Sequence, residues 1–74
     1  MSDLLSRITV EPEKMGGKPC IRGLRIRVSD VLDLLAEGLS NQQVIEELPS
    51  LEEDDIRAVF AYASRRLNHT IVAG

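Results

Sequence analysis

The stretch that decides the fold is residues 16–28, which read GGKPCIRGLRIRV. Gly23 stands between Cys20-Ile21 and the residues that follow, where a tight turn needs a positive φ. After it, apolar and charged residues alternate, which is typical of a strand with one buried face. The stretch therefore predicts a β-hairpin with Leu24, Ile26 and Val28 on its apolar face and Arg25 and Arg27 on the other.

The residues before the hairpin predict one more short strand. Arg7–Val10 places Ile8 and Val10 on one face of an extended segment, which can add a third strand to the hairpin. Pro12 ends this segment because proline donates no hydrogen bond to a ladder. We expect a loose arm over residues 1–6 and a loop over residues 14–17.

Signals for helix ends divide the chain after the hairpin. Ser29 is the predicted N-cap of a first helix, and Gly38 is its natural stop. Ser40 and Gln43 have the spacing of a capping box, which predicts the start of a second helix. Pro49 closes that helix, because proline cannot continue it.

A third and longer helix is predicted from Ser50 to about Asn68. Ser50 and Glu53 repeat the capping-box spacing. Acidic residues fill the first turn, and Arg65 and Arg66 stand near the end, as the helix dipole favours. Apolar residues recur at three- and four-residue spacing and predict a buried stripe of Ile56, Val59, Phe60, Ala63 and Leu67.

The order of these elements predicts an α+β fold in a single domain over residues 1–74. A β-hairpin region over 7–28 precedes a three-helix unit over 29–68, and a short tail follows over 69–74. The first two predicted helices are joined by a short turn that contains Gly38, which is the outline of a helix-turn-helix.

Composition narrows the class of protein. A chain of 74 residues buries a modest core, and its one cysteine excludes an internal disulfide framework and suggests a reducing compartment. No long apolar run predicts a membrane span or a signal peptide, so we expect a cytoplasmic protein.

Charge is unevenly distributed along the chain. Residues 1–28 hold six basic and three acidic residues, whereas residues 29–74 hold three basic and nine acidic ones. The acidic run Glu52–Asp55 is expected to be a solvated helix end, since it would repel phosphate at the start of a recognition helix. The candidate DNA-binding residues are therefore those of the basic ribbon, Lys18, Arg22, Arg25 and Arg27. The alternative is that these side chains only keep an exposed edge soluble.

The sequence offers no pattern for catalysis or for metal binding. Gly16-Gly17-Lys18 lacks the spacing of a phosphate-binding loop, and Pro19 stands where that loop needs Ser or Thr. His69 is the only histidine and Cys20 the only cysteine, which argues against zinc sites and Cys-His catalysis. We therefore expect a protein without catalytic residues, metal or cofactor.

Four segments, residues 17–28, 34–40, 48–51 and 54–58, carry a combined pattern. Together they resemble the bacterial domain-of-unknown-function family numbered 433. The resemblance extends from Ile8 to Ala63, and Leu24 and Glu52 stand where the family often has Thr. It implies a helix-turn-helix-related fold and, for many members, the antitoxin half of a toxin–antitoxin pair with a small PIN-like nuclease as partner.

We therefore expect a non-enzymatic, antitoxin-like protein that binds and restrains a PIN-like nuclease and can bind its operator. The alternative is a structural protein–protein interaction module with no nucleic-acid role. Two groups of arginines could reach the acidic centre of such a nuclease: those of the hairpin, Arg22, Arg25 and Arg27, and those near the end of the third helix, of which the second is slightly favoured. The residues predicted to contact the partner are Arg65, Arg66, Ile71 and Val72. The opposite hypothesis is that Glu52–Asp55 mimics RNA. A homodimer through the hairpin edge is also expected.

Overall fold

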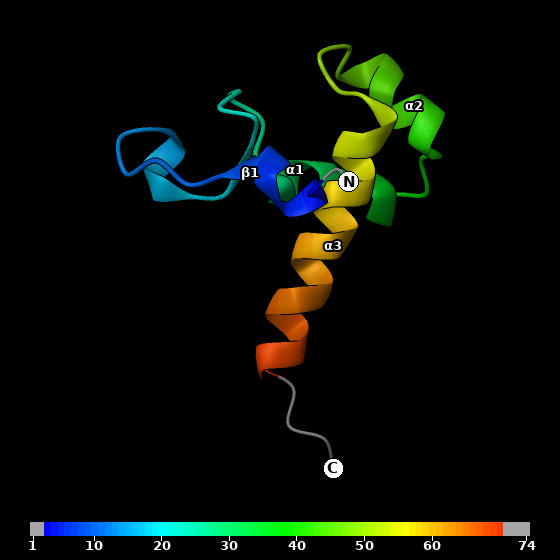
Figure 1. Cartoon of the computed structure of the whole chain (residues 1–74). Helices are drawn as coiled ribbons and strands as arrows, with labels where there is room; N and C mark the ends of the chain where they lie inside the picture. Colours follow the sequence, from blue (N-terminus) through cyan, green and yellow to red (C-terminus); the bar gives the residue numbers. More distant parts are fainter. Residues whose placement is uncertain (1–2, 71–74) are drawn as a thin grey trace.

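A computed structural model of the chain describes residues 3–70, with side chains described through Leu67. It confirms the α+β class, with a small antiparallel sheet near the N-terminus followed by three helices (Figure 1). In chain order the elements are η1 (Leu4–Arg7), β1 (Ile8–Thr9), η2 (Met15–Gly17), β2 (Cys20–Ile21), α1 (Val28–Ala36), α2 (Asn41–Glu47) and α3 (Glu53–Thr70). The two η elements are short 3₁₀ turns. The first three residues of η1 fall in the segment 1–6, where a loose arm is predicted, and its last residue is Arg7, the predicted start of the strand.

The sheet is smaller than the sequence predicts. β1 and β2 pair antiparallel, with Ile8 opposite Ile21 and Thr9 opposite Cys20. After β2 the chain turns through two residues of positive φ, as in a type I′ turn: Arg22 at 44° and Gly23 at 70°. The predicted second hairpin strand is not formed, because among the described residues that follow only Arg27 makes a bridge, to Cys20.

The apolar alternation after Gly23 is used for core packing rather than for strand pairing. Leu24 and Ile26 are partly buried and pack against the core cluster. The N–H of Ile21 donates to the carbonyl of Ile26 at 3.0 Å, which holds the segment against β2 without extending the ladder. The prediction of a β-hairpin is therefore right about the turn and wrong about the second strand, which is reduced to the single bridge of Arg27 with Cys20.

Helix α1 begins earlier than predicted. Its N-cap is Arg27 rather than Ser29, since the Asp30 carboxylate accepts the backbone N–H of Arg27 at 3.0 Å. The same carboxylate also accepts from the Arg27 guanidinium, at 2.9 and 3.2 Å. These bonds satisfy the helix start, and Ser29 is left as an exposed residue in the first turn.

Helix α2 starts as predicted. Ser40 is its N-cap, and the Ser40 hydroxyl accepts the N–H of Gln43 at 3.2 Å. The Gln43 side chain accepts the N–H of Ser40 in return, at 2.8 Å. The capping box is therefore confirmed. Gly38, with φ of 102°, provides the left-handed residue that ends α1.

The start of α3 differs from the prediction. Ser50 does not cap it. The first helical hydrogen bonds are accepted by the carbonyl of Glu52, and the Asp55 carboxylate accepts the N–H of Glu52 at 2.8 Å. Asp55, three residues after Glu52, therefore has the role that was predicted for Glu53, three residues after Ser50.

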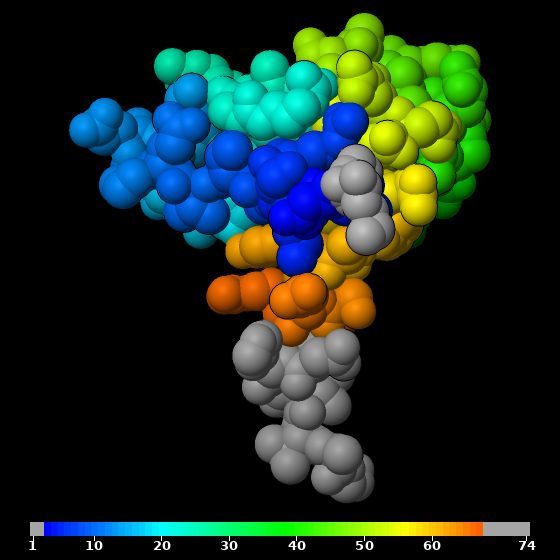
Figure 2. Space-filling view, viewed as in Figure 1, coloured from blue at the N-terminus to red at the C-terminus, as the bar shows by residue number. Residues whose placement is uncertain are grey.

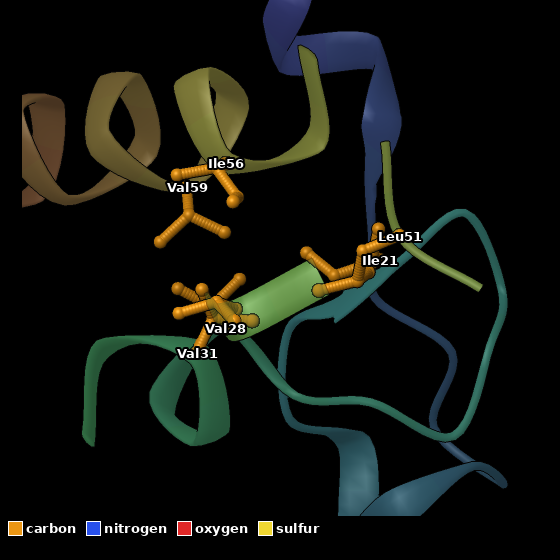
Figure 3. Close-up of a cluster of buried hydrophobic side chains, with 7 residues drawn as sticks. Ile21, Val28, Val31, Leu51, Ile56 and Val59 are labelled. Carbon is orange, nitrogen blue, oxygen red and sulfur yellow. The ribbon is translucent and has the colours of Figure 1, made fainter. Parts of the chain in front are cut away.

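The core lies where the N-terminal half of α3 meets α1, α2 and β2. Figure 3 shows side chains of α3 facing those of α1 across this cluster, with Ile21 and Leu51 at its other end. Ile56 and Val59 are fully buried, as predicted, but Phe60 is 48% and Leu67 54% exposed. The predicted apolar stripe is thus buried only in part. In Figure 2 the last described residues of α3, in orange, lie below the rest of the body.

Candidate functional site

Two arginines converge on one buried carboxylate at the start of α3. Asp55 is 0% exposed. Its Oδ1 accepts from Arg7 Nη1 at 2.9 Å and from Arg22 Nε at 3.0 Å, and its Oδ2 accepts from Arg22 Nη2 at 2.8 Å. With the bond from the Glu52 N–H, both carboxylate oxygens are satisfied. This Asp55 cluster joins η1, the turn after β2 and the first turn of α3, which are far apart in the sequence.

The Asp55 cluster also holds an unusual backbone. Arg22 has a left-handed φ, which costs a non-glycine residue about 1–2 kcal/mol. The N–H of Arg22 donates to the carbonyl of Arg7 at 2.7 Å, and its guanidinium donates to the carbonyl of Ser50 at 2.8 Å as well as to Asp55. These bonds hold the left-handed turn in place, and Gly23 completes it.

The charge state of Asp55 follows from these contacts. Burial alone would raise the pKa of the Asp55 carboxyl, but the hydrogen bonds from Arg22, from the backbone of Glu52 and from Arg7 outweigh it. The pKa of Asp55 therefore lies below its usual range, and the group is ionised at neutral pH. The expectation that the whole run Glu52–Asp55 is solvated is wrong for Asp55.

A groove of about 430 Å³ opens where α3 leaves the body. Most of its wall is apolar, and the basic side chains of Lys18 and Arg66 stand among its lining residues. The groove lies between α3, the first half of α1 and the segment just before β2. Its walls are formed by Lys18, Pro19, Val28, Ser29, Leu32, Tyr62, Ala63, Arg66 and Leu67. An apolar groove with basic side chains at its edge can bind an apolar segment of another molecule that also carries carboxylates.

The four predicted DNA-binding residues do not form one exposed ribbon. Arg22 is held by Asp55, and Arg27 is held by Asp30, which lowers the pKa of the Asp30 carboxyl. Arg25 and Lys18 have exposed side chains. Binding to a polyanion, which stays a prediction, would therefore rest first on Lys18 and Arg25.

The predicted partner-binding residues are only partly described. Arg65 and Arg66 are both exposed on the projecting half of α3, and the Arg66 guanidinium lies 5.9 Å from the centre of the Tyr62 ring. That distance is in the range of a cation–π contact. Ile71 and Val72 lie outside the described residues.

Sequence reasoning missed both the groove and the Asp55 cluster. One signal for the cluster was present: Asp55 stands four residues before Val59 and so belongs to the buried face of α3. An acidic residue at a core position needs a basic partner, and Arg7 and Arg22 were available. The groove had no such signal, because its walls come from three separate segments.

Residues 3–70 contain no group of three or more His, Cys, Asp and Glu side chains that could hold a metal ion. None of the helices in this range is long and apolar enough to span a membrane.

Comparison with known proteins gives a family but no activity. The chain is similar to the uncharacterized protein y4eO of Sinorhizobium fredii (strain NBRC 101917 / NGR234), with 39% identity over 56 residues. The match covers 76% of this chain but only 25% of the length of that relative. No solved structure shows a significant match. The family described as "Protein of unknown function (DUF433)" matches residues 8–63, and the chain therefore belongs to that family.

Proposed function

We propose that this protein acts in the cytoplasm as a non-enzymatic, antitoxin-like protein that binds and restrains a PIN-like nuclease. The observation that supports binding to a protein partner is the groove beside the projecting half of α3. Apolar recesses with a few charged groups are typical of sites that take up a segment of another molecule. The choice of a nuclease as partner rests on the antitoxin role that the resemblance to family 433 implies for many of its members.

The chemistry of the groove suits such a partner. Metal-dependent nucleases hold divalent cations with several carboxylates. Lys18 and Arg66 beside an apolar wall can pair with carboxylates at the mouth of that centre while apolar side chains enter the groove. Arg65, one position before Arg66, adds a second guanidinium on the projecting helix.

Ser29 offers a direct test of the groove. It is exposed, lines the groove and lies in the first turn of α1, where glutamate is favourable for the helix. Ser29→Glu should weaken binding to the nuclease encoded beside this gene by at least about tenfold, because a carboxylate at the groove repels an acidic partner. Ser29→Lys, of similar size, should change the Kd by less than about threefold. Calorimetric titration of the purified nuclease measures both.

The results for Ser29→Glu and Ser29→Lys also show which part of the proposal is wrong if the expected difference is not found. Equal weakening by both charges would show that size alone matters and that the basic groups do not recognise the partner. Unchanged binding by both would place the contact elsewhere on the protein. Absence of a complex with the wild-type chain would contradict the nuclease-binding function itself.

Operator binding is a second proposal, and the exposed Arg25 and Lys18 favour it. Arg25→Ala with Lys18→Ala should weaken binding to DNA upstream of the gene and reduce the log–log salt slope by about one unit for each lost phosphate contact. Fluorescence anisotropy at several salt concentrations measures both quantities. If the wild-type chain does not bind this DNA at low salt, the alternative of an interaction module without a nucleic-acid role is favoured.

A further inference from the structure

The groove beside α3 is continuous with the hydrophobic core. Val28 is 5% exposed, belongs to the core cluster and also lines the groove. In Figure 3 its side chain lies with that of Val31 on α1, facing Val59 of α3. Two other wall residues, Ser29 of α1 and Ala63 of α3, have small side chains that allow a close approach to these helices. A segment bound in the groove would therefore extend the packing between α1 and α3.

The backbone around the groove is hydrogen-bonded within the chain. The N–H of Lys18 donates to the carbonyl of Met15 at 3.3 Å. Pro19 has no N–H, and its carbonyl accepts the N–H of Val28 at 3.0 Å. The other walls are helices α1 and α3, and a helix pairs its N–H and C=O groups along its own axis except at its ends. The first turn of α1 adds at most the N–H of Ser29.

This arrangement argues against a bound segment in the form of a β-strand. A strand that joins a sheet edge exchanges a row of N–H···O bonds with it, and a single donor cannot supply that row. An extended segment without such bonds would leave its own N–H and C=O groups unpaired against an apolar wall, which costs free energy. A helix satisfies its own backbone, so it can bind through side chains alone.

The charges at the groove indicate which kind of helix fits. Lys18 stands on the wall before β2 and Arg66 on the α3 wall, and both side chains are exposed. The residues that line the groove include no acidic side chain. A helix with carboxylates on both sides of its apolar stripe can pair with the two basic groups, whereas a basic helix would be repelled.

We propose that the groove binds an acidic amphipathic helix of the partner nuclease. Apolar residues of that helix, spaced at i, i+3, i+4 and i+7, enter between α1 and α3, and its carboxylates lie toward Lys18 and Arg66. A groove of about 430 Å³ has room for a few such side chains. This inference rests on the proposed nuclease-binding function, to which it adds the conformation and the charge of the bound segment.

Photo-cross-linking in the complex with the nuclease encoded beside this gene identifies the bound segment. Ser29→Cys carries a thiol-reactive photo-cross-linker at the groove, and the native Cys20 is buried and should not be labelled. Mass spectrometry should find the label on a nuclease segment with apolar residues at helical spacing and with more acidic than basic residues beside them. Gln42→Cys, exposed on α2, is the control and should not label that segment.

A synthetic peptide with the sequence of the labelled segment tests its conformation. Proline at a polar position in the middle of the peptide should weaken binding to the full chain at least about tenfold, because proline interrupts a helix. Alanine at the same position should change the Kd by less than about threefold. Fluorescence anisotropy of the labelled peptides measures both values.

Paired charge reversals test recognition of the carboxylates. Lys18→Glu with Arg66→Glu should weaken binding of the unmodified peptide at least about tenfold. Arg25→Glu with Arg57→Glu makes the same change in net charge at exposed positions outside the groove and should weaken it by less than about threefold. Circular dichroism checks that both variants stay folded. Equal weakening by the two variants would overturn the assignment of Lys18 and Arg66 as the groups that recognise the helix.

The other outcomes separate this inference from the function on which it rests. The helical segment is contradicted if the labelled residues lack helical spacing, if the peptide does not bind at about 1 mM, or if its proline and alanine variants bind equally. A nuclease complex that forms without labelling from position 29 would leave nuclease binding intact and overturn only the groove as its site. Absence of any complex would contradict the proposed function itself.

Discussion

Replacing Asp55 by alanine is expected to destabilise the fold by about 2–4 kcal/mol, a large part of the stability of a 74-residue domain. The substitution removes the acceptor for Arg7, for both nitrogens of Arg22 and for the N–H of Glu52. The expected loss stays below that of a fully buried ion pair, because both arginines are partly exposed and can regain water. Urea unfolding followed by circular dichroism at pH 7 measures it.

Asp54 provides the matched control, since it is the same residue type one position earlier. Its side chain is 44% exposed and makes longer ion pairs, at 3.4 Å with Arg57 and 3.8 Å with Arg7. Asp54→Ala should therefore cost less than about 0.5 kcal/mol. Equal losses for the two variants would show that the acidic run acts through its overall charge and not through the Asp55 cluster.

The pH dependence of stability checks whether Asp55 stabilises the fold through its charge. The pKa of Asp55 is lower in the folded than in the unfolded chain, so its ionised form stabilises the fold at any pH above the ordinary value of about 4. This contribution is lost as the pH falls below about 4, through the lowered pKa of the folded state. The stability difference between wild type and Asp55→Asn should therefore narrow in that acidic range. A constant difference would contradict the charge-based account.

The sequence was a good guide to features that depend on neighbouring residues. The Ser40–Gln43 capping box links residues three positions apart, and its geometry follows from the local chain alone. The turn at Gly23 is local in the same sense. Both could be predicted because no distant part of the molecule competes for the groups involved.

Features that join distant segments could not be predicted in this way. Asp55 is 48 residues from Arg7 and 33 from Arg22. Because Asp55 also accepts the N–H of Glu52, helix α3 begins there and not at the predicted cap Ser50. The alternation after Gly23 predicted a strand, but Leu24 and Ile26 instead pack on a core cluster that brings together β2, the three helices and Leu51. Periodicity also could not show that Phe60 would stay 48% exposed, since the burial of a side chain depends on what covers the helix there.

Replacing both Arg65 and Arg66 by alanine is expected to restore the activity of a bound PIN-like nuclease by at least about tenfold while the complex still forms. A guanidinium can pair with the metal-binding carboxylates through two parallel hydrogen bonds, and it is charged at every relevant pH. It would then compete with the divalent cation. Added Mg²⁺ or Mn²⁺ should therefore weaken inhibition by the wild-type chain. Cleavage of a labelled RNA, with complex formation followed separately, measures both effects.

Arg57 is the matched control for this pair, because it lies on the same helix with its side chain 66% exposed. Arg57→Ala should leave inhibition unchanged. The opposing hypothesis of RNA mimicry by the acidic turn is tested with Glu53→Gln and Asp54→Asn together. Asp55 is left intact in this variant, since its loss would destabilise the fold and could mimic a loss of inhibition. If this variant no longer inhibits while the Arg65/Arg66 variant inhibits as well as wild type, the acidic turn and not the arginine pair blocks the nuclease.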